Sequence, residues 1–137
     1  GAGLVSTIDD FARFAAILAN GGALGNVRLL MPATIAAMQV NVVPDEVIAR
    51  GNPFPLFNKG LGWGLGLMTV HDPAAAGRIE GKGTLSWEGA AGTWFWADPA
   101  NGIAFVGMIQ NFEKAGINGY DGSGRLRPIV YSSLIVP

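Results

Sequence analysis

The stretch that decides the fold reads Ser86-Trp87-Glu88-Gly89-Ala90-Ala91-Gly92-Thr93-Trp94-Phe95-Trp96-Ala97-Asp98-Pro99. It leads from one short segment, through a bend of small residues, into an aromatic segment that Asp-Pro closes. Two such segments on either side of a glycine-containing bend predict a β-hairpin, with strands over residues 84–88 and 93–97. Because the bend carries only small side chains, its backbone N–H groups are open to a bound molecule.

The neighbouring segments predict helices before and after this hairpin. The first helix begins at Thr7, which precedes two aspartates that favour a helix start, and it ends at Asn20-Gly21-Gly22. A second helix begins at Pro32, and residues 125–136 predict a closing helix. The apolar stripes of the three helices are, in order, Phe11, Phe14, Ala15 and Leu18; Ile35 and Met38; and Leu126, Ile129, Val130 and Leu134.

The remaining segments predict further strands and three connections. Glycine alternates with larger residues from 60 to 70, which predicts one strand with a glycine face that another element approaches closely. Residues 103–110 predict the next long strand. The connections are residues 41–59, 74–82 and 111–124. The sum is an α+β fold, an antiparallel sheet flanked by helices, over a single domain of residues 1–137.

Composition excludes several classes of function. Half of the residues are apolar and 14% are charged, which suffices for a hydrophobic core. The formal net charge is −1 without a basic stripe, so we expect no nucleic-acid partner. The chain has no cysteine, and no apolar run reaches the roughly 18 residues of a membrane span. We expect neither a metal nor another cofactor. The start, without Met or a signal peptide, suggests a truncated chain and leaves the compartment open.

Other candidate sites have simpler explanations. His71 is the single histidine, so we interpret it as a turn residue rather than a metal ligand. The alternating glycines lack the lysine and the following helix of a phosphate-binding loop. Gly122-Ser123-Gly124 lacks the pattern of a nucleophile elbow and is interpreted as loop. Trp94-Phe95-Trp96 fits either core packing or the wall of an acyl pocket.

Three segments together resemble the C-terminal half of the class C-like serine hydrolases, within the β-lactamase and penicillin-binding-protein superfamily. The first runs from Gly3-Leu4-Val5-Ser6-Thr7-Ile8-Asp9-Asp10-Phe11-Ala12-Arg13-Phe14 to Asn20-Gly21-Gly22, the second is Gly62-Trp63-Gly64-Leu65-Gly66, and the third is residues 87–99. Trp87-Glu88-Gly89 resembles the third conserved motif in its esterase-type form, where tryptophan replaces the lysine of Lys-Thr-Gly. The resemblance implies a C-terminal portion of the β-lactamase/transpeptidase-like fold.

The resemblance also implies an acyl-enzyme mechanism and a set of site residues. In this family a serine of Ser-x-x-Lys attacks the substrate carbonyl, Tyr-x-Asn assists proton transfer, and the third motif lines the opposite wall. Carried over, Trp87, Glu88 and Gly89 occupy the motif, and Ala90 supplies the oxyanion N–H. Glu88 departs from the usual small residue, and the motif lacks its usual cation. Both departures favour an uncharged ester over a β-lactam.

The nucleophile motifs are absent from the sequence. The serines are Ser6, Ser86, Ser123, Ser132 and Ser133, and none has a lysine three residues later; neither tyrosine begins Tyr-x-Asn. We therefore expect a C-terminal fragment of a serine hydrolase (esterase, β-lactamase or D-Ala-D-Ala carboxypeptidase type) that is inactive alone and whose parent takes a small ester or amide. The alternatives are a non-catalytic, penicillin-binding-like protein that binds a ligand or partner, and a complete short interaction module. Exposed apolar surface on a fragment predicts self-association.

Overall fold

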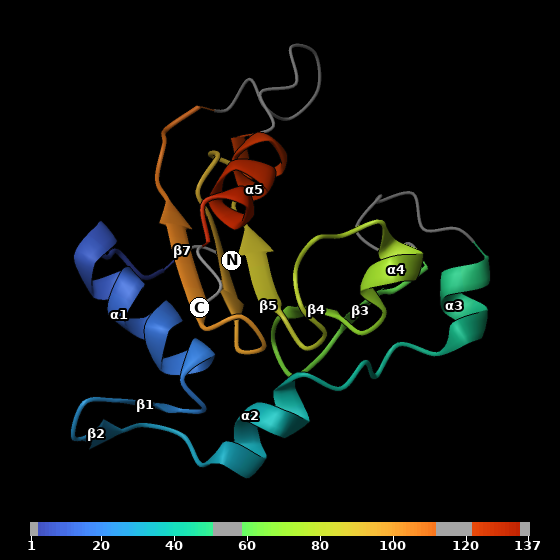
Figure 1. The fold of residues 1–137 in the computed structure, drawn as a ribbon, viewed down its shortest axis with the longest axis horizontal. Coiled ribbons are helices and arrows are strands. Elements are labelled where there is room, and N and C mark those ends of the chain that lie inside the picture. Colours follow the sequence, from blue (N-terminus) through green and yellow to red (C-terminus); the bar gives the residue numbers. More distant parts are fainter. Residues whose placement is uncertain (1–2, 51–58, 112–121, 135–137) are drawn as a thin grey trace.

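A five-stranded antiparallel sheet forms the centre of the computed structural model, which describes residues 3–50, 59–111 and 122–134. Each strand pairs with the next along the chain, in the order β3-β4-β5-β6-β7 (Figure 1). The elements are α1 (Ile8–Ala19), β1 (Ala23–Leu24), β2 (Val27–Arg28), α2 (Pro32–Met38), α3 (Asp45–Ala49), β3 (Leu61–Trp63), β4 (Met68–Val70), α4 (Pro73–Ala76), β5 (Leu85–Glu88), β6 (Trp94–Asp98), β7 (Ile103–Gly107) and α5 (Gly122–Ser132). The predicted α+β class is confirmed.

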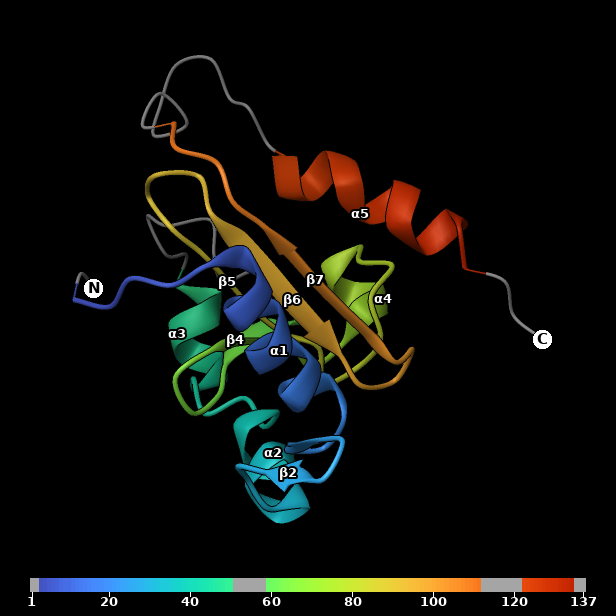
Figure 2. The ribbon, with the colours of Figure 1, turned by 90° about the vertical axis from the view of Figure 1, so that its left-hand side faces the viewer.

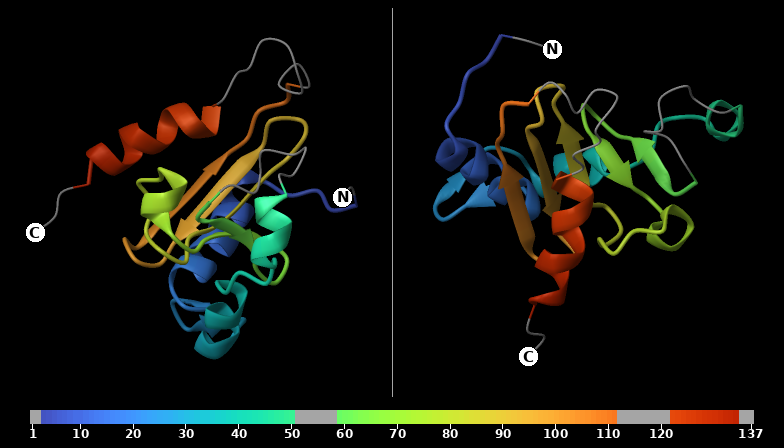
Figure 3. Two further views of the ribbon diagram at one scale, coloured as in Figure 1. Left: turned by 90° about the vertical axis from the view of Figure 1, so that its right-hand side faces the viewer. Right: turned by 90° about the horizontal axis from the view of Figure 1, so that it is seen from above.

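Helices cover both faces of the sheet. Figure 2 and the view from above in Figure 3 show α1 against one face and α5 against the other. The buried core on the α1 face consists of Ala15, Leu18, Ala19, Ile35, Phe95 and Ala97. The core on the α5 face consists of Trp94, Trp96, Ile103 and Tyr131. None of the helices in the described part of the chain has the length and apolar character that a bilayer span requires.

The central hairpin forms as predicted. In β5 and β6 the paired residues include Trp87 with Phe95 and Glu88 with Trp94. Because paired residues of an antiparallel ladder lie on the same face, Trp87 lies on the α1 face and Glu88 on the α5 face. Adjacent motif residues therefore serve different sides of the sheet.

The first helix also begins and ends as predicted. The hydroxyl of Thr7 accepts a hydrogen bond from the Asp10 N–H at 3.2 Å. At the other end, Gly21 and Gly22 have φ angles of 67° and 94°, which favour glycine. The sequence signals at both ends are therefore confirmed.

We expect Thr7→Ala to lower the free energy of unfolding by about 1 kcal/mol, because it removes the acceptor of the first helical turn. Urea unfolding at pH 7 measures this change. Ser6→Ala is the matched control, since the Ser6 hydroxyl only donates to the adjacent Thr7 carbonyl at 3.2 Å. Equal stability of the two variants would show that the Thr7 cap contributes nothing.

The single strand predicted over residues 60–70 is wrong. The segment forms the β3–β4 hairpin, with Trp63 opposite Met68 and the Gly64 N–H donating to the Leu67 carbonyl at 2.8 Å. Gly66 has a φ of 82°, a turn conformation that glycine adopts without strain. The close approach to the glycines is present: a side chain at Gly64 would overlap the Met38 carbonyl.

Two predicted connections contain short helices. Helix α3 lies within residues 41–59, and its first turn carries Asp45 and Glu46; residues 51–58 lie outside the described residues. Helix α4 begins at Pro73, just before the predicted 74–82 connection, and extends into it; the carboxylate of the preceding Asp72 accepts from the Ala75 N–H at 3.1 Å. Acidic residues at each start explain why both helices form.

The closing helix begins earlier than predicted, and its buried face is shifted: Leu126 and Val130 of the predicted stripe pack on the core, and polar residues fill the rest of that face. Gly122 and Ser123 belong to α5, so the loop prediction for them is wrong; residues 112–121 and 135–137 lie outside the described residues. The buried positions include Ser123, Arg127 and Tyr131, whereas Ile129 of the predicted apolar stripe is 62% exposed. These three residues are buried because their side chains contact the carboxylates of Glu88, Glu80 and Asp98.

Candidate active site

The third-motif segment lies where strand β5 leaves its neighbour β4. β4 pairs with β5 only at Ser86 and Leu85. Beyond Ser86, β5 is held in the ladder by β6 alone. The open side of this strand end is the position that the sequence predicts for an active-site wall.

A tight turn presents the predicted oxyanion donor at this strand end. The Gly89 N–H donates to the Thr93 carbonyl at 2.7 Å, and the Gly92 N–H donates to the Gly89 carbonyl at 3.0 Å. Ala90 takes the second position of the turn, is exposed, and its N–H makes none of these bonds. Among the described backbone hydrogen bonds of this turn, none ties the Ala90 N–H to β6.

Trp87 forms an aromatic edge beside this turn. Its side chain is 39% exposed, and its ring meets the Trp63 ring edge to face at 4.9 Å between centroids. Trp63 comes from β3, so the β3–β4 hairpin brings it across to β5. The arrangement places two indole rings at the open side of the motif strand.

A cavity of about 690 Å³ opens on the α1 face next to Trp87 and Gly89. The N-terminal segment 4–6 and two phenylalanines of α1 line it from one side, and Met108 closes part of the other. None of the described residues around it is charged. Trp94 and Phe95 are buried in the core, as one interpretation of the aromatic segment expects, and they also line this cavity; its use as an acyl pocket stays a prediction.

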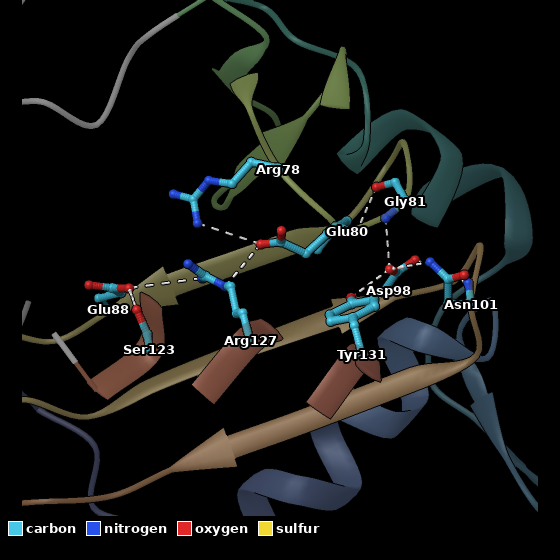
Figure 4. A network of polar contacts seen from close by, with 10 residues as sticks. Arg78, Glu80, Gly81, Glu88, Asp98, Asn101, Ser123, Arg127 and Tyr131 are labelled. Carbon is cyan, nitrogen blue, oxygen red and sulfur yellow. Dashed lines mark hydrogen bonds and ion pairs between the residues drawn. The ribbon is translucent and has the colours of Figure 1, made fainter. Parts of the chain in front are cut away.

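Glu88 faces α5 rather than the cavity. The Ser123 hydroxyl donates a hydrogen bond to Glu88 Oε1, and Arg127 Nη2 lies 3.9 Å from the same oxygen (Figure 4). From the sequence, Glu88 stands out as a departure from the usual small residue of the motif. Its contacts make it a partner of the closing helix.

Arg127 is a buried cation held between two carboxylates. Its Nε lies 2.9 Å from Glu80 Oε1, and its guanidinium stacks 5.2 Å from the centroid of the Trp96 ring. Arg78 approaches the same Glu80 oxygen at 3.6 Å. The attraction between Arg127 and the carboxylates offsets the free-energy cost of burying the charges of Arg127 and Glu80.

Asp98 is the centre of a second buried cluster in Figure 4. The Tyr131 hydroxyl donates to Asp98 Oδ2 at 2.6 Å and the Gly81 N–H donates at 2.8 Å. Asn101 donates through its backbone at 3.1 Å and its side chain at 2.8 Å. Burial alone would raise the pKa of Asp98, but these hydrogen bonds outweigh it and hold the pKa below its usual range. Burial and the neighbouring carboxylate raise the pKa of Tyr131 well above its ordinary value.

The sequence analysis did not identify the residues that helix α5 contributes to these two clusters. Ser123, Arg127 and Tyr131 follow one another at four-residue spacing, which places them on one face of a helix. This spacing is visible in the sequence. It was not used because the helix was predicted to begin at residue 125 and to bury its apolar residues. Glu80 and Asp98 were also not identified.

His71 and the described acidic residues form no metal-binding group. His71 is partly buried, and its Nε2 has no hydrogen-bond partner. Within residues 3–50, 59–111 and 122–134 no group of three acidic or histidine side chains is placed to hold a metal ion. The roles predicted for Trp87, Glu88, Gly89 and Ala90 stay predictions, although Trp87 and Gly89 do line one cavity.

The fold and the position of the motif strand define the class as a β-lactamase-like hydrolase fold. The Beta-lactamase family model matches residues 1–123, and the chain belongs to this family. The resemblance seen in the sequence is confirmed, including its esterase-type branch.

Known relatives are much longer than this chain. It is 38% identical over 114 residues to an uncharacterized protein of Mycobacterium tuberculosis, covering 81% of this chain and 28% of that protein. It is 32% identical over 122 residues to Esterase EstB of Burkholderia gladioli, covering 87% of this chain and 27% of that protein. The chain thus spans less than a third of the length of these curated relatives.

Two solved structures share the fold. The first, EstCE1, is described as a hydrolase with promiscuous acyltransferase activity; it gives a TM-score of 0.65 at 28% identity, over 90% of this chain and 29% of that one. The second is a putative beta-lactamase from Bacteroides dorei, with a TM-score of 0.61 at 28% identity, over 96% of this chain and 41% of that one.

Proposed function

We propose that this chain forms the oxyanion-side wall of a serine hydrolase that cleaves small uncharged esters through an acyl-enzyme. The observation that carries the proposal is the turn after the motif strand. Its hydrogen bonds do not use the Ala90 N–H, and the preceding Gly89 lines an uncharged cavity. The nucleophile comes from residues outside this chain.

The chemistry needs one backbone donor at this position. A serine oxygen attacks the ester carbonyl, and negative charge develops on the carbonyl oxygen while the alcohol departs with a proton. The Ala90 N–H donates to that oxygen in the transition state. Water then attacks the acyl-enzyme and releases the carboxylic acid, which frees the serine.

The cavity lining favours an uncharged substrate. A penicillin-like carboxylate would find no cation among the described residues around the cavity. Apolar and aromatic side chains instead suit an acyl or alkoxy group. Since Glu88 is turned to α5, its carboxylate does not obstruct the cavity, and the substitution gives little support to a non-catalytic binding protein.

We expect the isolated chain to remain unacylated by p-nitrophenyl acetate, as measured by intact mass. Ser86 and Ser123 are buried, and Ser132 and Ser133 bond to carbonyls of their own helix. Ser6 lines the cavity, so Ser6→Ala is the matched control. An adduct of one acetyl group that disappears in Ser6→Ala would place the nucleophile inside this chain and overturn the proposal.

A chimeric enzyme tests whether this chain supplies the oxyanion donor. In it, this chain replaces the matched stretch of Esterase EstB, which supplies the rest of the domain. Hydrolysis of p-nitrophenyl esters by this chimera, combined with substitutions at Ala90, reports directly on the proposed donor.

A further inference from the structure

Three polar residues on one face of α5 meet three carboxylates, of which Glu88 and Asp98 lie on β5 and β6 and Glu80 lies in the connection between α4 and β5. Ser123 contacts Glu88, Arg127 contacts Glu80 and Glu88, and Tyr131 contacts Asp98. Figure 4 shows all three side chains of α5 pointing toward the sheet. The helix is therefore held by contacts at three points along its length. The first of them, at Ser123, joins the helix to the motif strand β5.

The Ser123 contact lies where β5 pairs with only one neighbouring strand. Glu88 is the last residue of β5, and β4 no longer pairs with the strand at that point. Ala90 follows two residues later. A force that holds the Glu88 side chain therefore limits how far the turn can move relative to β6.

The helix side of this contact is itself rigid. Arg127 is buried against the Trp96 ring and Glu80, one helical turn from Ser123. Leu126 and Val130 of the same helix pack on the aromatic core. The anchor for Glu88 is therefore part of the core rather than a mobile surface group.

On the basis of the proposed function, we infer that Glu88 is a positioning residue: α5, through Ser123 and Arg127, latches the end of β5 and sets the direction of the Ala90 N–H. The closing helix then acts in catalysis without contact with the substrate. The unusual carboxylate of the third motif likewise acts away from the cavity.

Amide hydrogen exchange of the 137-residue chain tests the latch without any need for activity. We expect Ser123→Ala to raise the exchange rates of the Gly89 and Gly92 amides about tenfold, because a hydrogen bond to a charged group is lost. The amides of β7 should keep their rates. Ser132→Ala on the same helix is the matched control, since its hydroxyl bonds only to the Ile129 carbonyl at 2.9 Å.

Two outcomes would overturn the latch. One is unchanged exchange at Gly89 and Gly92 in Ser123→Ala; the other is an equal rise at the turn and in β7, which would indicate only global destabilisation. Ser123→Thr keeps the hydroxyl and should restore slow exchange. If Ser123→Ala does not fold, Glu88→Ala is measured by the same criterion, with the exposed Glu46→Ala as its control.

Kinetics in the EstB chimera separate this inference from the proposed function. We expect Ser123→Ala to lower kcat about 10- to 100-fold with little change in KM, the effect of a misplaced group. Loss of turnover in Ala90→Pro with full kcat in Ser123→Ala would overturn the latch alone. Full turnover in Ala90→Pro would overturn the proposed function instead.

Discussion

Replacing Ala90 by proline in the EstB chimera should lower kcat/KM for p-nitrophenyl esters about 100- to 1,000-fold, because proline has no N–H to donate to the oxyanion. The substitution is mild for the backbone. Ala90 stands at the second position of a turn, where proline is favoured, and no described non-glycine residue has a positive φ. Steady-state hydrolysis measures the effect.

Ala90→Ser is the control for this substitution. Serine keeps the backbone N–H while it changes the side chain, so its kcat/KM should stay within a few-fold of the unsubstituted chimera. Circular dichroism confirms that both variants fold. A folded Ala90→Pro chimera with the activity of Ala90→Ser would show that Ala90 is not the donor.

The second large effect concerns stability. We expect Asp98→Ala to lower the free energy of unfolding by about 3 kcal/mol or more, because the substitution leaves several buried donors, among them the Tyr131 hydroxyl and the Gly81 N–H, without an acceptor. Urea unfolding at pH 7 measures the loss. Exposed Asp45→Ala in α3 is the control and should cost less than about 1 kcal/mol. Similar losses in the two variants would contradict the role of Asp98.

The charge of Asp98 gives this stability a pH dependence. Its pKa is lower in the folded protein than the roughly 3.9 of an unfolded chain, so its contribution is present above that value and is lost as the pH falls through the folded pKa. The stability difference between the natural chain and Asp98→Asn should therefore shrink from pH 7 to pH 2. A constant difference would show that the carboxylate charge is irrelevant.

The sequence predicts the central hairpin well because its signals are local. A small-residue bend sits between two strand segments, and the bounds differ from the structure by only a residue or so. Residues 60–70 were wrongly predicted because alternating glycine suits both a strand and a turn. Only the pairing of Trp63 with Met68 decides between them.

The closing helix shows the limit of apolar periodicity. Its buried face carries Ser123 and Arg127 because carboxylates on β5 and in the connection before it offer them partners. Those carboxylates are distant in the sequence, so a pattern within the helix alone cannot reveal the pairing. The same long-range contacts turn Glu88 away from the cavity, whereas the positions of Trp87 and Ala90 followed from strand alternation and the turn.

The most direct test of the account is the pre-steady-state release of p-nitrophenol by the EstB chimera. Acylation gives a burst of about one product per chain when the acyl-enzyme accumulates. We expect Ala90→Pro to slow this burst about 100-fold or more relative to Ala90→Ser. Equal burst rates in the two variants would contradict the claim that this chain supplies the oxyanion donor.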